Sequence, residues 1–416
     1  MDVEIVTIGT ELLLGQTLDT NATELARALL AAGARVVRQT SVSDDPEAVR
    51  DALAGALART RFAVATGGLG PTRDDVTKRV AAELFGVPLV TDDAYLRRLE
   101  ERWQRLGRPG PMPEANKTQA EVPAGATVLP NPRGTAPGLW LEDARGVVAL
   151  LPGVPHEMRA MAVAEVAPRV AARAEPGRTT VWRTLRTTGI SESAVADRVG
   201  PLEADLAPLT LAYLPSFDGV DLRITAWRLD PDDAERRLAA AAARIRNAVE
   251  AGYYGEGEAD LAAVVLDRAR ARGLRLAVAE SCTGGIVGAR LTAVPGASAV
   301  FVGGVIAYEN QVKTRDLAVP PGVIEAHGAV SEPVVRGMAE GVRRRFEAGA
   351  AIAVSGIAGP DGGTADKPVG TVWLCAAADE RVRAVRVRFP GDRAEIRTRA
   401  AQAALDLMRR TLEGSG

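Results

Sequence analysis

Short apolar runs alternate with amphipathic segments over the first part of the chain. Residues 3–9, 34–42 and 62–68 are predicted to form strands, and the apolar repeats of 21–32 and 46–59 predict helices. Alternation of this kind indicates a parallel sheet with helices on both faces. The chain is therefore expected to begin with an α/β domain of three layers.

The pattern changes after this unit, where longer strands flank two helices. We expect a small α+β domain here, followed by a linker at residues 251–260 that is rich in glycine and acidic residues. The predicted strands are 181–189, 209–215 and 220–227, and the predicted helices are 191–205 and 231–250.

Strand–helix alternation returns from residue 260 onward and predicts a second three-layer α/β domain. Its predicted strands are 274–279, 299–308, 350–356, 370–378 and 382–390, and helices are expected at 260–272, from Ser331 and at 392–412. The fold class is α/β, with two three-layer domains joined by the small α+β domain. The three predicted domains span residues 1–175, 176–252 and 253–416.

Composition excludes several classes of protein. The 416 residues exceed what one core usually holds, and the net charge of −2 gives no general attraction to nucleic acid or anionic membranes. The chain opens with a strand instead of a signal peptide, and it has no apolar run of transmembrane length. Two distant cysteines and two histidines exclude a disulfide framework and a common zinc site. We expect a cytoplasmic protein that binds neither nucleic acid nor membrane.

Lysine is rare in this chain. Of the 51 basic residues only four are lysines, Lys78, Lys117, Lys313 and Lys367, and the other 47 are arginines. A genome rich in G and C favours arginine at surface positions, so a retained lysine marks a place where a guanidinium cannot serve. A need for a deprotonated amine is one such reason.

The segment AESCTGG, residues 279–285, places a serine and a cysteine between a buried strand and a helix start. Nucleophiles are often held at such junctions. Cys282 is one candidate, but cysteine hydrolases usually need a histidine partner, and both histidines, His156 and His327, lie in turns far away in sequence. Because successive residues of an extended chain face opposite sides, a site containing Ser281 directs Cys282 into the core. Ser281 is therefore the preferred nucleophile.

Ser281 needs a base, and Lys313 is the only lysine between Lys117 and Lys367. A lysine kept neutral by burial can deprotonate a serine. Tyr308 precedes it by five residues and could relay that proton or donate one to the leaving group. The alternative is that Lys313 is a solvated loop charge and Tyr308 only ends a strand. The rarity of lysine argues against that alternative.

Other residues near these segments are predicted to bind substrate. Backbone N–H groups at a helix start suit an oxyanion or a phosphate, and glycine loops let amides approach an anion. Two arginines one turn apart on a helix could hold a phosphate, or they could be a surface stripe. The predicted substrate-binding residues are Thr283, Gly284, Gly285, Ser355, Gly356, Gly359, Gly363, Thr364, Arg393 and Arg397.

The glycine-rich segments 9–16 and 66–75 follow strands of the first predicted sheet, at the edge where α/β folds bind ligands. Backbone amides there could hold a phosphate, while Asp74 or Asp75 binds a bridging metal ion. The alternative is that these acids only cap a helix. The predicted nucleotide-binding residues are Glu11, Asn21, Gly67, Gly68, Gly70, Thr77, Lys117, Asn131, Pro152 and Gly153.

The segments AESCTGG, GGVIAYENQVK, HGAVSE, SGIAGPDGG with KPVGTVW, and GDR follow each other in a characteristic order. Over about 150 residues this order resembles the C-terminal domain of the CinA family, the nicotinamide mononucleotide amidohydrolases. The resemblance implies hydrolysis of nicotinamide mononucleotide to nicotinate mononucleotide and ammonia, with no cofactor in this domain. It also implies Ser281 as nucleophile, Lys313 as base and Tyr308 as an assisting group, with Arg397 and residues 355–364 binding substrate.

The first domain, through segments such as PNPRGTAPG and LPGVPHEM, resembles the molybdopterin-binding MogA/MoaB-like fold in the form found at the CinA N-terminus. That resemblance implies ADP-ribose pyrophosphatase activity dependent on Mg²⁺ or Co²⁺, and a homodimer. The middle segment resembles the KH-like domain of the same family, but no GxxG loop for RNA binding is expected in it.

Two other interpretations stay open. The chain could be a binding or scaffold protein linked to DNA uptake, with sites that are relics, although Ser281, Tyr308 and Lys313 are all present. It could instead be a pterin-binding protein of molybdenum cofactor synthesis, although its C-terminal motifs resemble an amidohydrolase.

Overall fold

The computed structural model describes residues 1–107, 110–175, 177–217 and 219–414. Contacts divide the chain into two compact units, each described by itself. Unit 1 contains Met1–Thr180 and Arg228–Pro231, and unit 2 contains Val181–Trp227 and Asp232–Gly416. The predicted start of the second domain, residue 176, lies outside the described residues.

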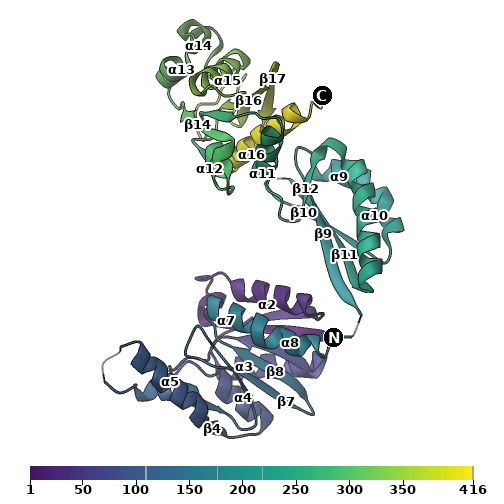
Figure 1. The fold of residues 1–416 in the computed structure, drawn as a ribbon, viewed down its shortest axis with the longest axis vertical. Coiled ribbons are helices and arrows are strands. Elements are labelled where there is room, and N and C mark those ends of the chain that lie inside the picture. The colour runs from purple at the N-terminus through teal and green to yellow at the C-terminus, as the bar shows by residue number, and fades with distance from the viewer. Residues whose placement is uncertain (108–109, 176, 218, 415–416) are drawn as a thin grey trace. The chain divides into compact units, whose positions relative to one another are not determined.

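Unit 1 is built on a six-stranded sheet with the order β2-β1-β3-β8-β7-β6 (Figure 1). Strands β2, β1, β3 and β8 are parallel, as predicted, but β7 runs antiparallel to both of its neighbours, β8 and β6. The tight turn between β7 and β8 explains this, because so short a connection can only join antiparallel neighbours. The strands are β1 Asp2–Ile8, β2 Arg35–Val42, β3 Phe62–Thr66, β6 Thr127–Leu129, β7 Gly138–Asp143 and β8 Gly146–Leu151.

Alternate residues of these strands supply two separate cores, one on each face of the sheet. Val6 and Ile8 of β1 pack with helices α3 and α4, whereas Val3 and Ile5 pack with α2, α7 and α8 (Figure 1). This arrangement confirms the predicted three layers. The helices are α1 Thr10–Leu13, α2 Thr20–Ala31, α3 Pro46–Thr60, α4 Thr77–Phe85, α5 Asp93–Arg105, α6 Glu114–Lys117, α7 Pro155–Met161 and α8 Ala167–Ala171, with a short sheet of β4 Leu89–Thr91 and β5 Glu121–Pro123.

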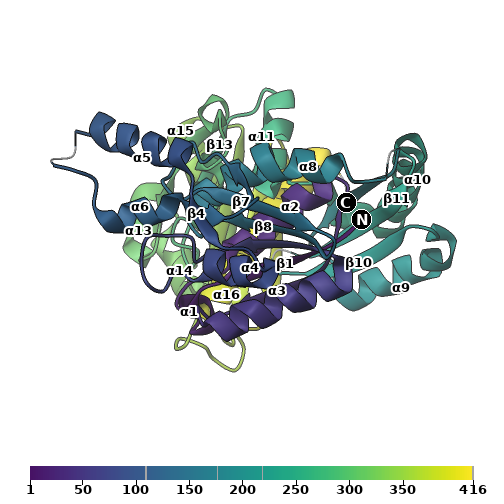
Figure 2. The same cartoon turned by 90° about the horizontal axis from the view of Figure 1, so that it is seen from below.

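The middle segment forms a four-stranded sheet with the order β10-β11-β9-β12, and helices α9 and α10 cover one of its faces (Figures 1 and 2). The linker predicted at 251–260 is wrong. Residues Tyr253–Glu256 form β12, which pairs with β9. Tyr254 of this strand is buried in the C-terminal core, so the segment is held in place on both sides. The elements are β9 Thr179–Thr187, α9 Glu192–Glu203, β10 Thr210–Pro215, β11 Val220–Leu229 and α10 Pro231–Val249.

The motif GxxG does occur in the middle segment, as Gly252, Tyr253, Tyr254 and Gly255. These residues run from a 3₁₀ turn into strand β12. Because Tyr254 is buried and the strand is paired with β9, this segment is not a loop that could clamp a nucleic acid backbone.

The C-terminal part of unit 2 is a five-stranded sheet with the order β14-β13-β15-β16-β17. Strands β14, β13 and β15 are parallel to one another, and β16 runs antiparallel to both of its neighbours, β15 and β17. Helices α11, α12 and α16 pack on one face and α13 to α15 on the other, which gives the second predicted set of three layers. The elements are α11 Leu261–Ala271, β13 Leu276–Glu280, α12 Ile286–Thr292, β14 Phe301–Ile306, α13 Asn310–Leu317, α14 Pro321–His327, α15 Glu332–Phe346, β15 Ala350–Gly356, β16 Thr371–Ala378, β17 Arg381–Arg388 and α16 Arg393–Glu413.

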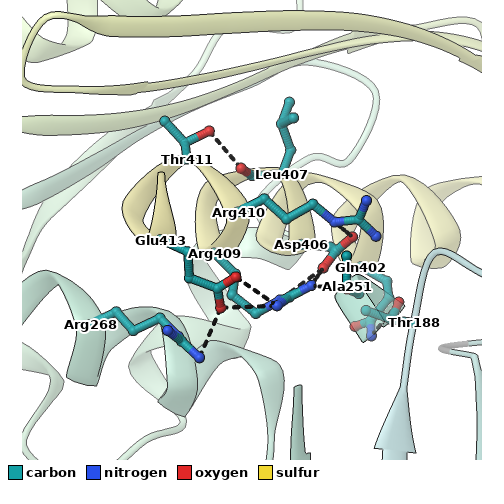
Figure 3. A network of polar contacts seen from close by, with 10 residues as sticks. All are labelled: Thr188, Ala251, Arg268, Gln402, Asp406, Leu407, Arg409, Arg410, Thr411 and Glu413. Carbon is teal, nitrogen blue, oxygen red and sulfur yellow. Dashed lines mark hydrogen bonds and ion pairs between the residues drawn. The ribbon is translucent and has the colours of Figure 1, made fainter. Parts of the chain in front are cut away.

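Helix α16 connects this sheet to the middle segment through buried polar contacts (Figure 3). The guanidinium of Arg409 is 2% exposed and donates to Asp406 Oδ1 at 2.7 Å, to Glu413 Oε1 at 2.9 Å and to the carbonyl of Ala251 at 2.6 Å. A second bond joins Gln402 Nε2 of α16 to Thr188 Oγ1 at 3.2 Å. These contacts fix the middle segment against the helix that begins at the candidate site described below.

No helix in the described ranges combines the length and the apolar character needed to cross a bilayer.

We predict that Arg409→Leu lowers the free energy of unfolding of unit 2 by about 3 kcal/mol, because a buried ion pair loses its cation. Urea unfolding followed by circular dichroism measures this change. Arg344→Leu is the matched control, since the ion pair between Arg344 and Glu340 is exposed at both ends and such pairs contribute about 1 kcal/mol or less. Equal losses in the two variants would contradict the role given to Arg409.

Candidate functional site

The predicted nucleophile lies directly after β13, the second strand of the C-terminal sheet. Strand β13 ends at Glu280, and the backbone N–H of Ser281 donates to the carbonyl of Val354 on β15 at 2.9 Å. Ser281 is 8% exposed and faces a cavity of about 270 Å³. Its place at the carboxyl edge of parallel strands is where ligands bind in folds of this class.

Lys313 lies in helix α13, and its amine reaches the serine. Lys313 Nζ is 3.3 Å from Ser281 Oγ, 2.8 Å from the carbonyl of Ala307 and 3.2 Å from the carbonyl of Tyr308. The residue is 1% exposed, and this burial lowers the pKa of its amine. A neutral amine has two N–H groups for the two carbonyls and one lone pair, which then faces the serine hydroxyl. The arrangement suits proton transfer from Ser281 to Lys313.

Cys282 turns away from the serine and joins the core. It is 5% exposed, packs in the apolar cluster that includes Val354 and Val372, and also borders the cavity. Burial raises the pKa of the Cys282 thiol to about 12, so the sulfur stays protonated at neutral pH. A protonated thiol is a weak nucleophile.

Tyr308 and Arg393 lie together at the cavity. Arg393 Nη2 donates to the phenol oxygen of Tyr308 at 2.7 Å, and Nη1 donates to the carbonyl of Gly359 at 2.6 Å. Because Arg393 donates to the phenol oxygen, the phenolic O–H can itself donate to a ligand. The ring of Tyr308 is 58% exposed, and only its backbone carbonyl contacts Lys313.

The cavity brings together seven of the predicted residues and adds others that the sequence analysis missed. The predicted ones are Ser281, Tyr308, Lys313, Ser355, Gly356, Gly359 and Arg393. Ile357, Ala358, Asp361 and Gly362 also line it and lie in the segment 355–364 that was expected to bind substrate. The missed residues are Asn310, Ala329 and Val330, with Cys282 also at the wall. Asn310 and Asp361 lie in the motifs GGVIAYENQVK and SGIAGPDGG. Their polar side chains could have marked them as site residues from the sequence.

The helix start after Ser281 is already occupied by a side chain of this protein. Glu280 is 1% exposed, and its carboxylate accepts the backbone N–H groups of Gly285 at 3.0 Å, Val287 at 3.1 Å and Gly288 at 2.8 Å. The N–H of Gly284 donates to the carbonyl of Ser281. These amides are therefore not free for an oxyanion or a phosphate. Sequence analysis missed Glu280, although an acid before a helix start is a known anchoring signal.

Four other predicted residues lie outside the cavity lining. Arg397 donates to the carbonyls of Cys282 at 3.1 Å and Thr283 at 2.9 Å, so it holds the strand–helix junction from behind. Thr283 is fully buried, and its hydroxyl has no partner among the described residues. Gly363 and Thr364 belong to the turn that the Thr364 N–H closes with the carbonyl of Lys367.

A second cavity, of about 340 Å³, lies in unit 1 beside the predicted glycine loop. Asn21, 9% exposed, donates to the carbonyl of Gly153 at 2.7 Å, while its Oδ1 has no partner in the described ranges. Thr77 is buried and donates to the carbonyl of Gly67 at 2.9 Å. The predicted residues at this cavity are Gly68, Gly70, Asp75, Pro152 and Gly153, and the missed ones include Gln119 and Glu157.

The predicted metal ligands do not fit a divalent ion. The carboxylate of Asp75 accepts the N–H and the hydroxyl of Thr72 at 2.8 and 2.5 Å and so closes a turn. Asp74 is exposed, and a hydrogen bond with Thr72 lowers the pKa of its carboxyl. Among the described residues, no three His, Cys, Asp or Glu side chains are grouped to hold a metal ion. No reaction step is therefore assigned to a metal here.

The remaining predicted residues of unit 1 have other roles. Lys117 pairs with the exposed Glu114 at 2.5 Å, and Glu11 is exposed on the short helix α1. Asn131 Nδ2 donates to the carbonyl of Ala136 and to the carboxylate of Glu157, and its Oδ1 accepts two backbone N–H groups of its own loop. The lysine that is buried in unit 1 is Lys78, which donates to the carbonyl of Thr118 and whose pKa burial lowers.

Comparisons with protein families divide the chain into three matched segments. Residues 258–412 match the CinA C-terminal domain, residues 4–172 match the "Probable molybdopterin binding domain", and residues 182–255 match the damage-inducible protein CinA KH domain.

Known proteins match over the whole length. A CinA-like protein of Gemmatimonas aurantiaca is 54% identical over 99% of this chain and 96% of its own length. A CinA-like protein of Gloeobacter violaceus is 44% identical over 98% of this chain and 96% of its own length.

Solved structures match parts of the chain. A competence-damaged protein (CinA) superfamily protein from Klebsiella pneumoniae is 36% identical over 37% of this chain and 96% of that chain, with a TM-score of 0.36. The molybdopterin biosynthesis enzyme MoaB from Thermus thermophilus is 19% identical over 41% of this chain and 94% of that chain, with a TM-score of 0.28. On the evidence of the full-length relatives and the three matched segments, the chain belongs to the CinA family.

Proposed function

We propose that the C-terminal domain hydrolyses the carboxamide of nicotinamide mononucleotide to nicotinate mononucleotide and ammonia. The observation that carries this proposal is the buried Lys313 amine 3.3 Å from the Ser281 hydroxyl, in a cavity at the carboxyl edge of the sheet. A serine paired with a neutral lysine is a known arrangement for acyl transfer. The choice of nicotinamide mononucleotide as substrate comes from the resemblance of the surrounding motifs to the family's amidohydrolases.

The first half of the reaction forms an ester. Ser281 Oγ attacks the carboxamide carbon while Lys313 Nζ takes the hydroxyl proton, and a tetrahedral intermediate forms. The C–N bond then breaks as Lys313 returns the proton to the leaving nitrogen. Ammonia departs and the acyl group stays on Ser281. Lys313 takes and returns this one proton through the lone pair that faces the serine.

The second half releases the acid. Water attacks the ester carbon and gives a proton to Lys313, after which the bond to Ser281 Oγ breaks and the serine regains that proton. Tyr308 is proposed to donate its free phenolic O–H to the substrate, and Arg393 to attract the nucleotide phosphate. Asp361 at the cavity wall carries the charge opposite to that of the pyridinium ring.

A second candidate function concerns unit 1. Its cavity contains the glycine loop and Gly153, whose carbonyl accepts Asn21 Nδ2, while Asn21 Oδ1 has no partner among the described residues. These features favour a bound pterin or nucleotide, in agreement with the name of the matched domain family. ADP-ribose pyrophosphatase activity stays a proposal for this unit, without an assigned metal.

We predict that Ser281→Ala lowers kcat for ammonia release from nicotinamide mononucleotide by at least about a thousandfold, because it removes the attacking atom. Cys282→Ala should retain most of the activity, since its thiol is protonated and packed in the core. A coupled ammonia assay measures both. Comparable losses in the two variants would return the choice of nucleophile to Cys282.

The burial of Lys313 predicts how kcat/KM depends on pH. The base must be unprotonated, and burial lowers its pKa below the ordinary 10.5, so kcat/KM should rise with pH through that lowered pKa and then level off. Lys313→Arg should lose about a hundredfold or more in kcat, because a guanidinium keeps the charge and cannot accept the proton. An active Lys313→Arg enzyme with the same pH profile would remove the lysine from the mechanism.

Glu280 is expected to position the nucleophile. In Glu280→Gln one carboxylate oxygen becomes an NH₂ group that faces a backbone N–H, so kcat should fall while KM changes little, and the free energy of unfolding should fall by roughly 1–3 kcal/mol. Steady-state kinetics and urea unfolding measure these effects. Glu325→Gln, an exposed position on α14, is the control and should match the wild type. A normal kcat in Glu280→Gln would disprove the positioning role.

A further inference from the structure

Helix α5 and the loop at 131–134 line a cavity of about 580 Å³ in unit 1. Arg98, Arg102 and Arg105 lie four and three residues apart on α5 and all line this cavity. We call it the arginine cavity. It is distinct from the cavity beside the glycine loop, although one loop separates them: Gly134 lines the first and Thr135 the second.

The three guanidinium groups outnumber the one carboxylate in the lining of the cavity. In the part of the chain that the structure describes, none of them forms an ion pair, whereas Arg50, Arg59 and many other arginines do. Arg102 donates to the carbonyl of Arg133 at 3.0 Å, and Arg105 donates to the carbonyl of Glu101 at 3.4 Å. Glu101 is the one acidic residue in the lining, so the cavity carries an excess of positive charge.

The opposite wall is rigidly built. Asn131 Oδ1 accepts the N–H groups of Arg133 at 3.0 Å and Gly134 at 2.8 Å, and its Nδ2 donates to the carbonyl of Ala136 at 2.8 Å. Tyr95 is buried, and its hydroxyl joins α5 to the same loop through the carbonyl of Thr135 at 3.1 Å. The cavity is therefore preformed, and a ligand would not have to order its walls.

The neighbouring cavity has the opposite electrostatic character. Its lining includes the carboxylates of Asp75 and Glu157 and no lysine or arginine. A phosphate beside the glycine loop would meet two negative charges with no cation to offset them. A phosphate in the arginine cavity would meet three guanidinium groups, whose paired donors match phosphate oxygens.

We propose that the arginine cavity is a binding site for a pyrophosphate group, held by Arg98, Arg102 and Arg105. Two linked phosphates offer enough negative charge and enough acceptor oxygens for three guanidinium groups. The glycine-loop cavity, where Gln119 Oε1 has no partner among the described residues, would then receive a part of the ligand that donates hydrogen bonds. This site is independent of the amide hydrolysis proposed for the C-terminal domain. It extends the nucleotide binding proposed for unit 1, and binding of inorganic pyrophosphate is measured without any hydrolysis.

Isothermal titration calorimetry of the full chain with inorganic pyrophosphate tests the proposal. The wild type should bind, and the double variant Arg98→Gln/Arg102→Gln should weaken the affinity about ten- to hundredfold. Raising the salt concentration should weaken wild-type binding more than binding by the variant. Orthophosphate should bind more weakly than pyrophosphate, because it reaches fewer of the three arginines.

Arg97→Gln is the matched control, since Arg97 is exposed on the same helix and outside the cavity lining. It removes one equal charge and should change the affinity less than twofold. Arg105→Gln, at the exposed end of α5, should weaken binding without endangering the fold, which circular dichroism would check. No heat of binding in the folded wild type, or equal weakening by Arg97→Gln and Arg105→Gln, would overturn the proposal.

Discussion

The C-terminal site depends on one buried carboxylate. Glu280 ends strand β13 and accepts three backbone N–H groups at the start of the helix that follows, at 2.8 to 3.1 Å. A buried charge is stable only when it is fully hydrogen-bonded, and the free amides of a helix start provide those bonds. The contact fixes the angle between β13 and α12, and Ser281 lies between them. It also occupies the helix start that an anion could otherwise use, and Arg393 is the arginine that lines the cavity.

Helix α16 supports this junction from the other side. Its first turn carries Arg393 at the cavity, its second turn carries Arg397 on the carbonyls of Cys282 and Thr283, and its last turns carry Arg409 on the middle segment. One rigid helix therefore links the candidate active site to the contact between the two parts of unit 2 (Figure 3).

The four rare lysines do not share one role. Lys313 and Lys78 are buried, and burial lowers the pKa of each amine, as expected where a guanidinium cannot replace it. Lys117 is an exposed partner of Glu114, and Lys367 donates to the carbonyl of His327. Composition alone singled out four residues, and only burial separates the two that are chemically unusual from the two that are ordinary.

The sequence by itself determined the layers and the order of most strands and helices, because apolar periodicity is a local property. The rarity of lysine singled out Lys313 as a partner for Ser281, and the tertiary structure brings the two side chains to 3.3 Å. The sequence did not determine the antiparallel pairing of β7 with β6 and β8, or strand β12, where a predicted linker buries Tyr254. Nor did it show that Glu280 fills the helix start or that Arg397 faces the junction instead of the cavity. Those outcomes depend on which backbone groups and side chains meet across the fold, at separations as large as that between Arg397 and Cys282. Only the tertiary structure decides such contacts, because a hydrogen bond needs distance and direction that spacing along the chain does not specify.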